Sequence, residues 1–322
     1  MTPKKTLDTL PTAFVFDVFG TVYDWRTTVS SRISQVLLQK LGSLDGIEAY
    51  PSSVSFPDGS KPDLSTTDAV DRFSKSFAQE WRDSYKGFVG SNGGINNDDD
   101  NVGDKEAESD SYTTVDTHHL HSLRSLLEKY SLAHLFTFTE THELSKIWHS
   151  LKPWDDSGPG ISGLKKLGIV STLSNGNVRL LVDLQRNSGV AFDLLLSGQV
   201  WRAFKPEERV YVGACEILGI GGGEEWRVYC EGGGRDGNVG EGEWRRKERG
   251  RVAMVAAHIG DLRAAKACGL TTIYIERPQE DDDRDAGERY LRDGEDWVDM
   301  WVRHDEGGIL EVARRLGELK KD

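Results

Sequence analysis

Short apolar runs alternate with amphipathic segments over much of the chain. Four of these runs are mostly apolar, as expected of strands in a parallel sheet whose two faces are both covered. They lie at residues 13–16, 168–173, 252–256 and 271–275. Segments with helical spacing lie near them, at residues 158–167, 177–188, 206–218 and 261–268. This alternation predicts an α/β fold with a Rossmann-like, doubly wound parallel sheet.

The region between the first two predicted strands has a different pattern, made of helical segments alone. We expect helices at residues 27–42, 67–87, 117–130 and 139–150. A helical region inserted directly after the first strand would cover the carboxyl edge of the sheet. We therefore predict a core domain at residues 1–24 and 152–322 and a helical cap domain at residues 25–151.

Three stretches interrupt both patterns because they are rich in glycine, serine, asparagine or acidic residues. Two lie in the cap, near residues 45–66 and 87–116, and a glycine-rich stretch lies in the core at residues 219–250. Such compositions predict flexible loop insertions. The glycine strings lack the preceding strand and the following GK[ST] of a phosphate-binding loop, so we assign them no ligand.

Charge is distributed unevenly along the 322 residues, whose formal net charge is −13. Residues 96–116 and residues 280–299 each carry a net charge of −7, so the remainder is close to neutral. We attribute this acidity to the solubility of the two stretches and not to the substrate. A net negative chain is a poor candidate for general nucleic-acid binding, which relies on basic patches.

Further classes are disfavoured by the sequence. No apolar run approaches the ~20 residues of a membrane span, and the N-terminus lacks the apolar stretch of a secretory signal. The three cysteines have no CxxC spacing, which suggests neither a disulfide framework nor a zinc site. We expect a cytoplasmic protein that binds neither nucleic acid nor membranes.

Polar residues with chemical potential follow the predicted strands. Asp17 ends the first strand, Ser174 and Asn175 follow the second, and Asp261 follows the third. Ligands of parallel sheets bind beyond the carboxyl ends of the strands. A poorly solvated carboxylate at such an end is a candidate nucleophile. The alternative for Asp17 is an ordinary turn or helix N-cap residue.

Four blocks of sequence resemble, in order, the motifs of the haloacid dehalogenase superfamily. They are FDVFGT (16–21), LSNGN (173–177), FKPEERVY (204–211) and AAHIGDLRAAKACGL (256–270). Each block is short, and their shared order and spacing carry the resemblance. It implies the haloacid dehalogenase fold with an inserted helical cap and Asp17 as the nucleophile.

Two differences distinguish this sequence from the phosphatases of that superfamily. Phosphatases typically carry a second aspartate as general acid where this chain has Phe19, which cannot donate a proton. They also bind magnesium through an acid four or five residues before the motif IV aspartate. Those places are Ala257 and Ala256, and alanine offers no oxygen ligand. We therefore expect no metal and no cofactor.

A segment of the predicted cap narrows the resemblance further. The sequence FAQEWR, ending at Arg82 and followed by Tyr85, resembles the cap helix of the (S)-2-haloacid dehalogenases. In that subfamily the arginine helps to bind the halogen and the substrate. The resemblance implies hydrolysis of short (S)-2-haloacids to 2-hydroxy acids through an ester on Asp17, without a metal. Relatives are often homodimers, which leaves a homodimer open here.

The resemblance also implies roles for the catalytic residues. Lys205 would neutralise and orient Asp17, and Thr21 would hold Asp17 or a developing oxyanion. Asp261 would orient or activate the water. Lys205 could instead be a surface lysine in a turn, and Asp261 could be only a helix cap.

Substrate binding is assigned in the same way. The main-chain amides of Val18 and Phe19, with Ser174 and Asn175, would bind the substrate carboxylate and the halide. A Ser-Asn pair at a strand end can equally be turn chemistry.

Two further residues have open roles. His258 stands where the best-characterised dehalogenases have asparagine, and it either positions water or is a buried structural histidine. Tyr211 matches a family position near Lys205, or it simply packs on its helix.

Two rival functions remain open from the sequence. The first is a phosphatase, or another hydrolase with an aspartate nucleophile, on the same fold. The second is a non-catalytic protein of this fold that binds a small anion.

Overall fold

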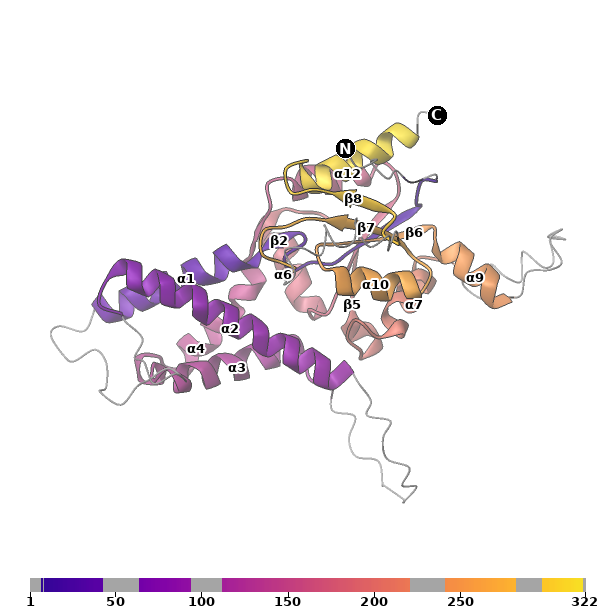
Figure 1. Cartoon of the computed structure of the whole chain (residues 1–322). Helices are drawn as coiled ribbons and strands as arrows, with labels where there is room; N and C mark the ends of the chain where they lie inside the picture. Colours follow the sequence, from indigo (N-terminus) through magenta and orange to yellow (C-terminus); the bar gives the residue numbers. More distant parts are fainter. Residues whose placement is uncertain are drawn as a thin grey trace, which may run out of the picture. The chain divides into compact units, whose positions relative to one another are not determined.

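The computed structural model describes residues 7, 9–42, 64–93, 112–220, 241–281 and 297–320 (Figure 1). The chain forms two compact units. Met1–Tyr23 and Pro153–Asp322 make the core unit, and Asp24–Lys152 makes the helical unit. Two short strands, β2 (Tyr23–Asp24) and β3 (Lys152–Pro153), lie where the chain passes from one unit to the other.

The core unit is built on a six-stranded sheet in the order β5-β4-β1-β6-β7-β8. Its strands are β1 (Ala13–Phe16), β4 (Ile169–Ser174), β5 (Leu194–Ser197), β6 (Val252–Ala256), β7 (Thr271–Ile275) and β8 (Met300–Val302). All neighbouring pairs are parallel. The predicted α/β fold is confirmed. Sequence analysis missed β5 and β8, the two edge strands, because each is short.

Helices cover both faces of this sheet. They are α5 (Ser157–Leu164), α6 (Val178–Ser188), α7 (Glu208–Ile217), α10 (Ile259–Ala267) and α12 (Gly308–Leu319), with a short 3-10 helix η3 (Gly198–Trp201). A further helix, α9 (Glu241–Arg249), precedes β6. On one face, Val15 and Met254 pack with Val210 of α7 and Leu262 of α10. Helices α5 and α12 pack together, and α12 lies on the opposite side of the sheet (Figure 1).

Two loop predictions need correction. The stretch 219–250 was predicted as loop, but its last part forms α9, whose Glu, Arg and Lys residues favour helix without showing an apolar face. The stretch 87–116 was predicted as an insertion, but α2 continues to Gly93 and α3 already begins at Val115. Residues 45–63, 94–111 and 221–240 of the predicted insertions lie outside the described residues.

The helical unit contains α1 (Trp25–Gly42), α2 (Thr67–Gly93), α3 (Val115–Lys129), η1 (Ala133–Leu135), α4 (Phe138–Ser145) and η2 (Lys146–Ser150). Its interior is aromatic. The ring of Trp148 stacks on Trp25 with a centroid distance of 5.8 Å and meets Trp81 edge-on at 5.5 Å. Among the described helices, none is both long and apolar enough to cross a membrane.

Candidate active site

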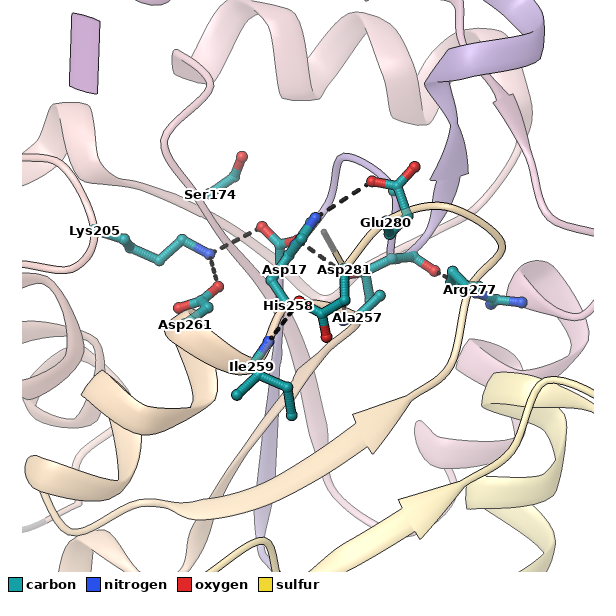
Figure 2. A network of polar contacts seen from close by, with 12 residues as sticks. Asp17, Ser174, Lys205, Ala257, His258, Ile259, Asp261, Arg277, Glu280 and Asp281 are labelled. Carbon is teal, nitrogen blue, oxygen red and sulfur yellow. Dashed lines mark hydrogen bonds and ion pairs between the residues drawn. The ribbon is translucent and has the colours of Figure 1, made fainter. Parts of the chain in front are cut away.

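Three adjacent strands bring the candidate residues to one edge of the sheet. Strand β1 lies between β4 and β6, with Phe16 opposite Thr172 and Val255. The residues that follow these strands therefore meet at the carboxyl edge. Figure 2 shows Asp17, Ser174 and His258 together there, with Lys205 and Asp261 beside them.

Asp17 is the centre of this cluster. Asp17 is only 8% exposed. Its Oδ1 accepts a hydrogen bond from Lys205 Nζ at 3.0 Å. Its Oδ2 accepts one from Thr21 Oγ1 at 2.9 Å and lies 3.0 Å from His258 Nδ1. The Thr21 hydroxyl is fixed in turn by the main-chain N–H of Ala257 at 2.9 Å, so the predicted contact between Thr21 and Asp17 is present.

Lys205 lies between two carboxylates. Its ammonium donates to Asp17 and also to Asp261 Oδ2. The other oxygen of Asp261 accepts a hydrogen bond from the Tyr211 hydroxyl at 2.6 Å. Lys205 is only 7% exposed, so it is not a surface lysine. Tyr211 is likewise more than a packing residue, because its hydroxyl binds Asp261.

The main chain of Lys205 is held by Asn175. The Lys205 N–H donates to Asn175 Oδ1 at 2.6 Å, and Asn175 Nδ2 donates to the Lys205 carbonyl at 3.2 Å. Ser174 is buried, and its hydroxyl oxygen accepts the Gly176 N–H at 3.1 Å. Val18 and Phe19 are buried as well. Asn175 thus links the end of β4 to the loop that carries the lysine.

Sequence reasoning missed Glu280. This residue opens the acidic stretch 280–299 that was attributed to solubility, and for Glu280 that reading is wrong, since it is 7% exposed. Its Oε2 lies 3.3 Å from His258 Nε2 (Figure 2). Gly20 has a φ of +82°, and a Cβ at that position would collide with the Glu280 carboxylate, so only glycine fits. A glutamate in an acidic tract gives no local signal of this placement.

The segment that carries Glu280 is anchored on both sides. Asp281 accepts hydrogen bonds from the Tyr274 hydroxyl at 2.8 Å and from the Ile259 N–H at 3.4 Å. Arg277 donates to both oxygens of Asp156, at 2.7 and 2.8 Å, and to the Thr21 carbonyl at 3.1 Å. These contacts fix the segment after β7 against the loop after β1.

The charges in this cluster shift one another's pKa values. Burial alone would raise the pKa of Asp17, but the Lys205 charge and the His258 hydrogen bond outweigh it and hold the pKa well below its usual range. Burial would lower the pKa of Lys205, and the charges of Asp17 and Asp261 instead raise it. Asp17 is therefore a carboxylate and Lys205 an ammonium near neutral pH.

The other members of the cluster are shifted too. Burial would lower the pKa of His258, but its hydrogen bonds to Asp17 and Glu280 raise it to about 10. Burial, opposed by the Lys205 charge, raises the pKa of Asp261. Burial and the neighbouring Asp261 charge raise the pKa of Tyr211. His258 is therefore an imidazolium that donates from both ring nitrogens near neutral pH.

Arg82 belongs to the helical unit, where α2 carries it. Its guanidinium lies 4.6 Å from the ring centroid of Tyr85 and 5.7 Å from that of Trp25. Both rings are buried. The guanidinium thus packs against two buried aromatic rings, and Arg82 is only partly exposed.

The described residues do not offer a metal site: within the ranges given above, no three His, Cys, Asp or Glu side chains are grouped so as to hold an ion. At the candidate site, the Lys205 ammonium already neutralises both Asp17 and Asp261.

The solved structures similar to this chain include dehalogenases. A defluorinating L-2-haloacid dehalogenase is 25% identical over 95% of each chain, with a TM-score of 0.63. Another L-2-haloacid dehalogenase is 23% identical over 96% of this chain and 100% of its own, with a TM-score of 0.60. The Xanthobacter autotrophicus L-2-haloacid dehalogenase with chloropropionic acid covalently bound is 17% identical over 95% and 98%, with a TM-score of 0.58.

Comparisons at the level of sequence complete the assignment. No curated protein sequence matches the chain. The family model of the haloacid dehalogenase-like hydrolases matches residues 11–269, which run from the first strand past the end of α10 and include Asp17, Lys205 and Asp261. With that match over most of its length and the six-stranded parallel sheet of the fold, the chain belongs to the haloacid dehalogenase-like hydrolases.

Proposed function

We propose that this hydrolase removes halide from short (S)-2-haloacids and forms 2-hydroxy acids through an ester on Asp17, without a metal. The observation that carries the proposal is an ionised, buried Asp17 whose counter-ion is Lys205. Phe19 stands where a phosphatase would need a proton donor. The similarity to a defluorinating L-2-haloacid dehalogenase adds support.

In the first half-reaction, an oxygen of the Asp17 carboxylate attacks C2 of the substrate from the side opposite the halogen. The C2–halogen bond breaks, the halide leaves with the electron pair, and the configuration at C2 inverts. A halide needs no protonation to leave, which suits a site with Phe19 in place of an acid. Lys205 keeps Asp17 ionised for the attack.

In the second half-reaction, water attacks Cγ of the Asp17 ester. The bond between Cγ and the ester oxygen breaks, so an oxygen of Asp17 leaves with the 2-hydroxy acid and water oxygen replaces it. We assign orientation or activation of this water to Asp261, which Lys205 and Tyr211 hold in place. Its raised pKa suits a proton acceptor.

Substrate binding is assigned to groups at the strand ends and in the helical unit. The main-chain amides of Val18 and Phe19, with Ser174, would bind the carboxylate and the halide. For Asn175 the contacts favour a supporting role, because its amide already holds the main chain of Lys205. We further propose that the helical unit acts as a cap and that Arg82 binds the substrate carboxylate or halide.

The test is a halide-release assay on (S)- and (R)-2-chloropropionate and haloacetates with a metal chelator present. We expect release from the (S) enantiomer and the haloacetates, loss of release in Asp17→Asn, and normal release in Asp183→Asn, whose carboxylate pairs with Arg179 on α6 at 2.9 Å. A single turnover in ¹⁸O-water should label Asp17 and not the product. Magnesium-dependent phosphate release from phosphoesters, without halide release, would establish the phosphatase instead.

A further inference from the structure

The two oxygens of Asp17 have unequal surroundings. Among the residues that the structure describes, Oδ1 accepts a hydrogen bond from Lys205 alone. Oδ2 accepts from both Thr21 Oγ1, at 2.9 Å, and His258 Nδ1, at 3.0 Å. A carboxylate oxygen has two lone pairs in its plane. Both lone pairs of Oδ2 are therefore occupied, and Oδ1 keeps one for attack on carbon.

This inequality decides which oxygen carries charge later in the reaction. If Oδ1 forms the ester, Oδ2 becomes the carbonyl oxygen of that ester. When water attacks Cγ, the electron pair of the carbonyl moves onto Oδ2. Donors that stabilise such an oxyanion lie about 2.7–3.1 Å from it. Thr21 and His258 already lie at 2.9 and 3.0 Å from Oδ2, before any substrate binds.

We propose that His258 is a catalytic residue that donates a charged hydrogen bond to the oxyanion during ester hydrolysis, and that Glu280 positions it and keeps it protonated. The inference rests on the proposed function and assigns a role to His258, which the sequence left open. Thr21 is the second donor. The family asparagine would offer a neutral amide at this position, whereas an imidazolium offers a full positive charge.

Glu280 is needed because the ester removes a charge. In the free enzyme His258 lies between Asp17 and Glu280, at 3.0 and 3.3 Å. Once Asp17 is esterified it is neutral, and Glu280 is then the carboxylate left in contact with the ring. Its side chain is only 4% exposed, so solvent screens this ion pair weakly. The anchored segment after β7 and the absent side chain of Gly20 let it approach this closely.

The other charged groups near His258 are bound to other partners. Lys205, from the loop before α7, and Asp261, on α10, face Asp17 from the far side and pair with each other. Asp281 lies beside Glu280 and binds the main chain at Ile259. The free-enzyme pKa of about 10 for His258 reflects both carboxylates. In the ester one of them is neutral, so we expect the pKa of His258 to lie below that value.

Protons and electrons balance in this step. Water oxygen bonds to Cγ while Asp261 takes one water proton, and the carbonyl pair moves to Oδ2 against Thr21 and His258. The carbonyl then re-forms and the bond from Cγ to Oδ1 breaks. The departing alkoxide receives the proton from Asp261. The second water proton leaves the new carboxyl group for solvent, and Asp17 returns to its ionised form while His258 stays protonated throughout.

The first experiment follows hydrolysis of the ester against pH. Wild-type enzyme is mixed with (S)-2-chloropropionate, quenched at intervals, and the adduct on Asp17 is measured by intact mass. The charged-donor role predicts that hydrolysis slows as pH rises through the pKa of His258. Glu280→Gln should move this fall to lower pH. A hydrolysis rate that instead rises through the same transition would make His258 a general base and overturn the assignment.

Variants at His258 give an independent readout. His258→Ala should slow ester hydrolysis by about 10²-fold or more while the halide burst persists, so that the adduct accumulates. His258→Asn should recover part of the rate, because an amide N–H still donates, and should lose the alkaline fall. Asn and Ala variants that are equally slow would contradict the donor role.

The matched control for Glu280→Gln is Glu276→Gln, four residues earlier in the same segment. Glu276 accepts hydrogen bonds from Trp301 Nε1 at 3.0 Å and from the His304 N–H at 3.1 Å. The Glu276→Gln variant should leave the pH profile of ester hydrolysis unchanged. Absence of both halide release and adduct in wild type overturns the proposed function and this inference with it. Halide and adduct with normal hydrolysis in His258→Ala overturns this inference alone.

Discussion

Two buried ion networks in the core unit use different cations. In the site network, Lys205 and His258 surround the carboxylates of Asp17, Asp261 and Glu280. In the anchor network, defined by Asp156 and Arg277, one guanidinium binds both oxygens of one carboxylate at 2.7 and 2.8 Å. Both are well buried: the Lys205 and Arg277 side chains are each 7% exposed.

The difference shows how charge is used for holding and for reacting. Arginine presents a rigid fork that binds both oxygens of a carboxylate at once. Asp156 also accepts the Ile309 N–H at 2.6 Å, so this pair ties α5, the end of β7 and the start of α12 together. Lysine and histidine each approach Asp17 at a single point. Asp17 stays ionised, and its Oδ1, which among the described residues accepts a hydrogen bond from Lys205 alone, keeps a lone pair for the proposed attack.

The largest effect should come from removing Lys205, the cation that Asp17 and Asp261 share in the site network. Lys205→Met leaves two buried carboxylates without their shared counter-ion, at a cost of about 3–5 kcal/mol of unfolding free energy. We also expect halide release to fall by at least ~10²-fold, because Asp17 loses the charge that keeps it ionised. Denaturant titration and the halide assay measure the two effects. The double variant Lys205→Met with Asp17→Asn should recover part of the stability; equal or lower stability would contradict shared pairing.

Breaking the anchor network should separate stability from chemistry. Asp156→Ala leaves the Arg277 guanidinium buried and unpaired and frees the N–H at Ile309, so we expect a loss of about 3–5 kcal/mol in unfolding free energy. Halide release per folded molecule should change far less than in Lys205→Met. Both are measured at a temperature where the variant remains folded. If turnover falls as much as in the lysine variant, the two networks do not have separate tasks.

A third effect concerns the pH dependence of stability. Because the folded-state pKa of His258 is raised to about 10, its proton stabilises the folded protein fully below the unfolded pKa of about 6.5. This contribution is lost as pH rises from there toward the folded value. We expect the unfolding free energy of wild type to decline over that range more steeply than that of His258→Asn. Parallel declines in denaturant titrations would show that His258 is not held as an imidazolium.

Much of the fold was predictable because the buried parallel strands are mostly apolar. Strands β1, β6 and β7 begin and end as the pattern predicts, and β4 is shifted by one residue. The edge strands β5 and β8 are too short to give such a signal. Helix α9 was missed for the opposite reason, since its charged residues favour helix without an apolar face to indicate it.

The candidate site, like the fold, was predictable only in part. Asp17, Lys205 and Asp261 lie within short motifs whose order along the chain identified them, and the structure brings them into contact. The contact by which Asn175 holds the main chain of Lys205 joins two loops and could not be foreseen. The same holds for the Tyr211 hydroxyl on Asp261.

The sequence by itself determined the alternating α/β pattern, the ionisable residues at the strand ends and the absence of an acid at Phe19. It placed half of the net charge of −13 in an acidic stretch that began, without distinction, at Glu280. Only the tertiary structure decided that this one acid is buried against His258 while Gly20 makes room for it. Local sequence reports propensity and burial pattern, whereas a contact between the ends of β6 and β7 exists only once the sheet has formed.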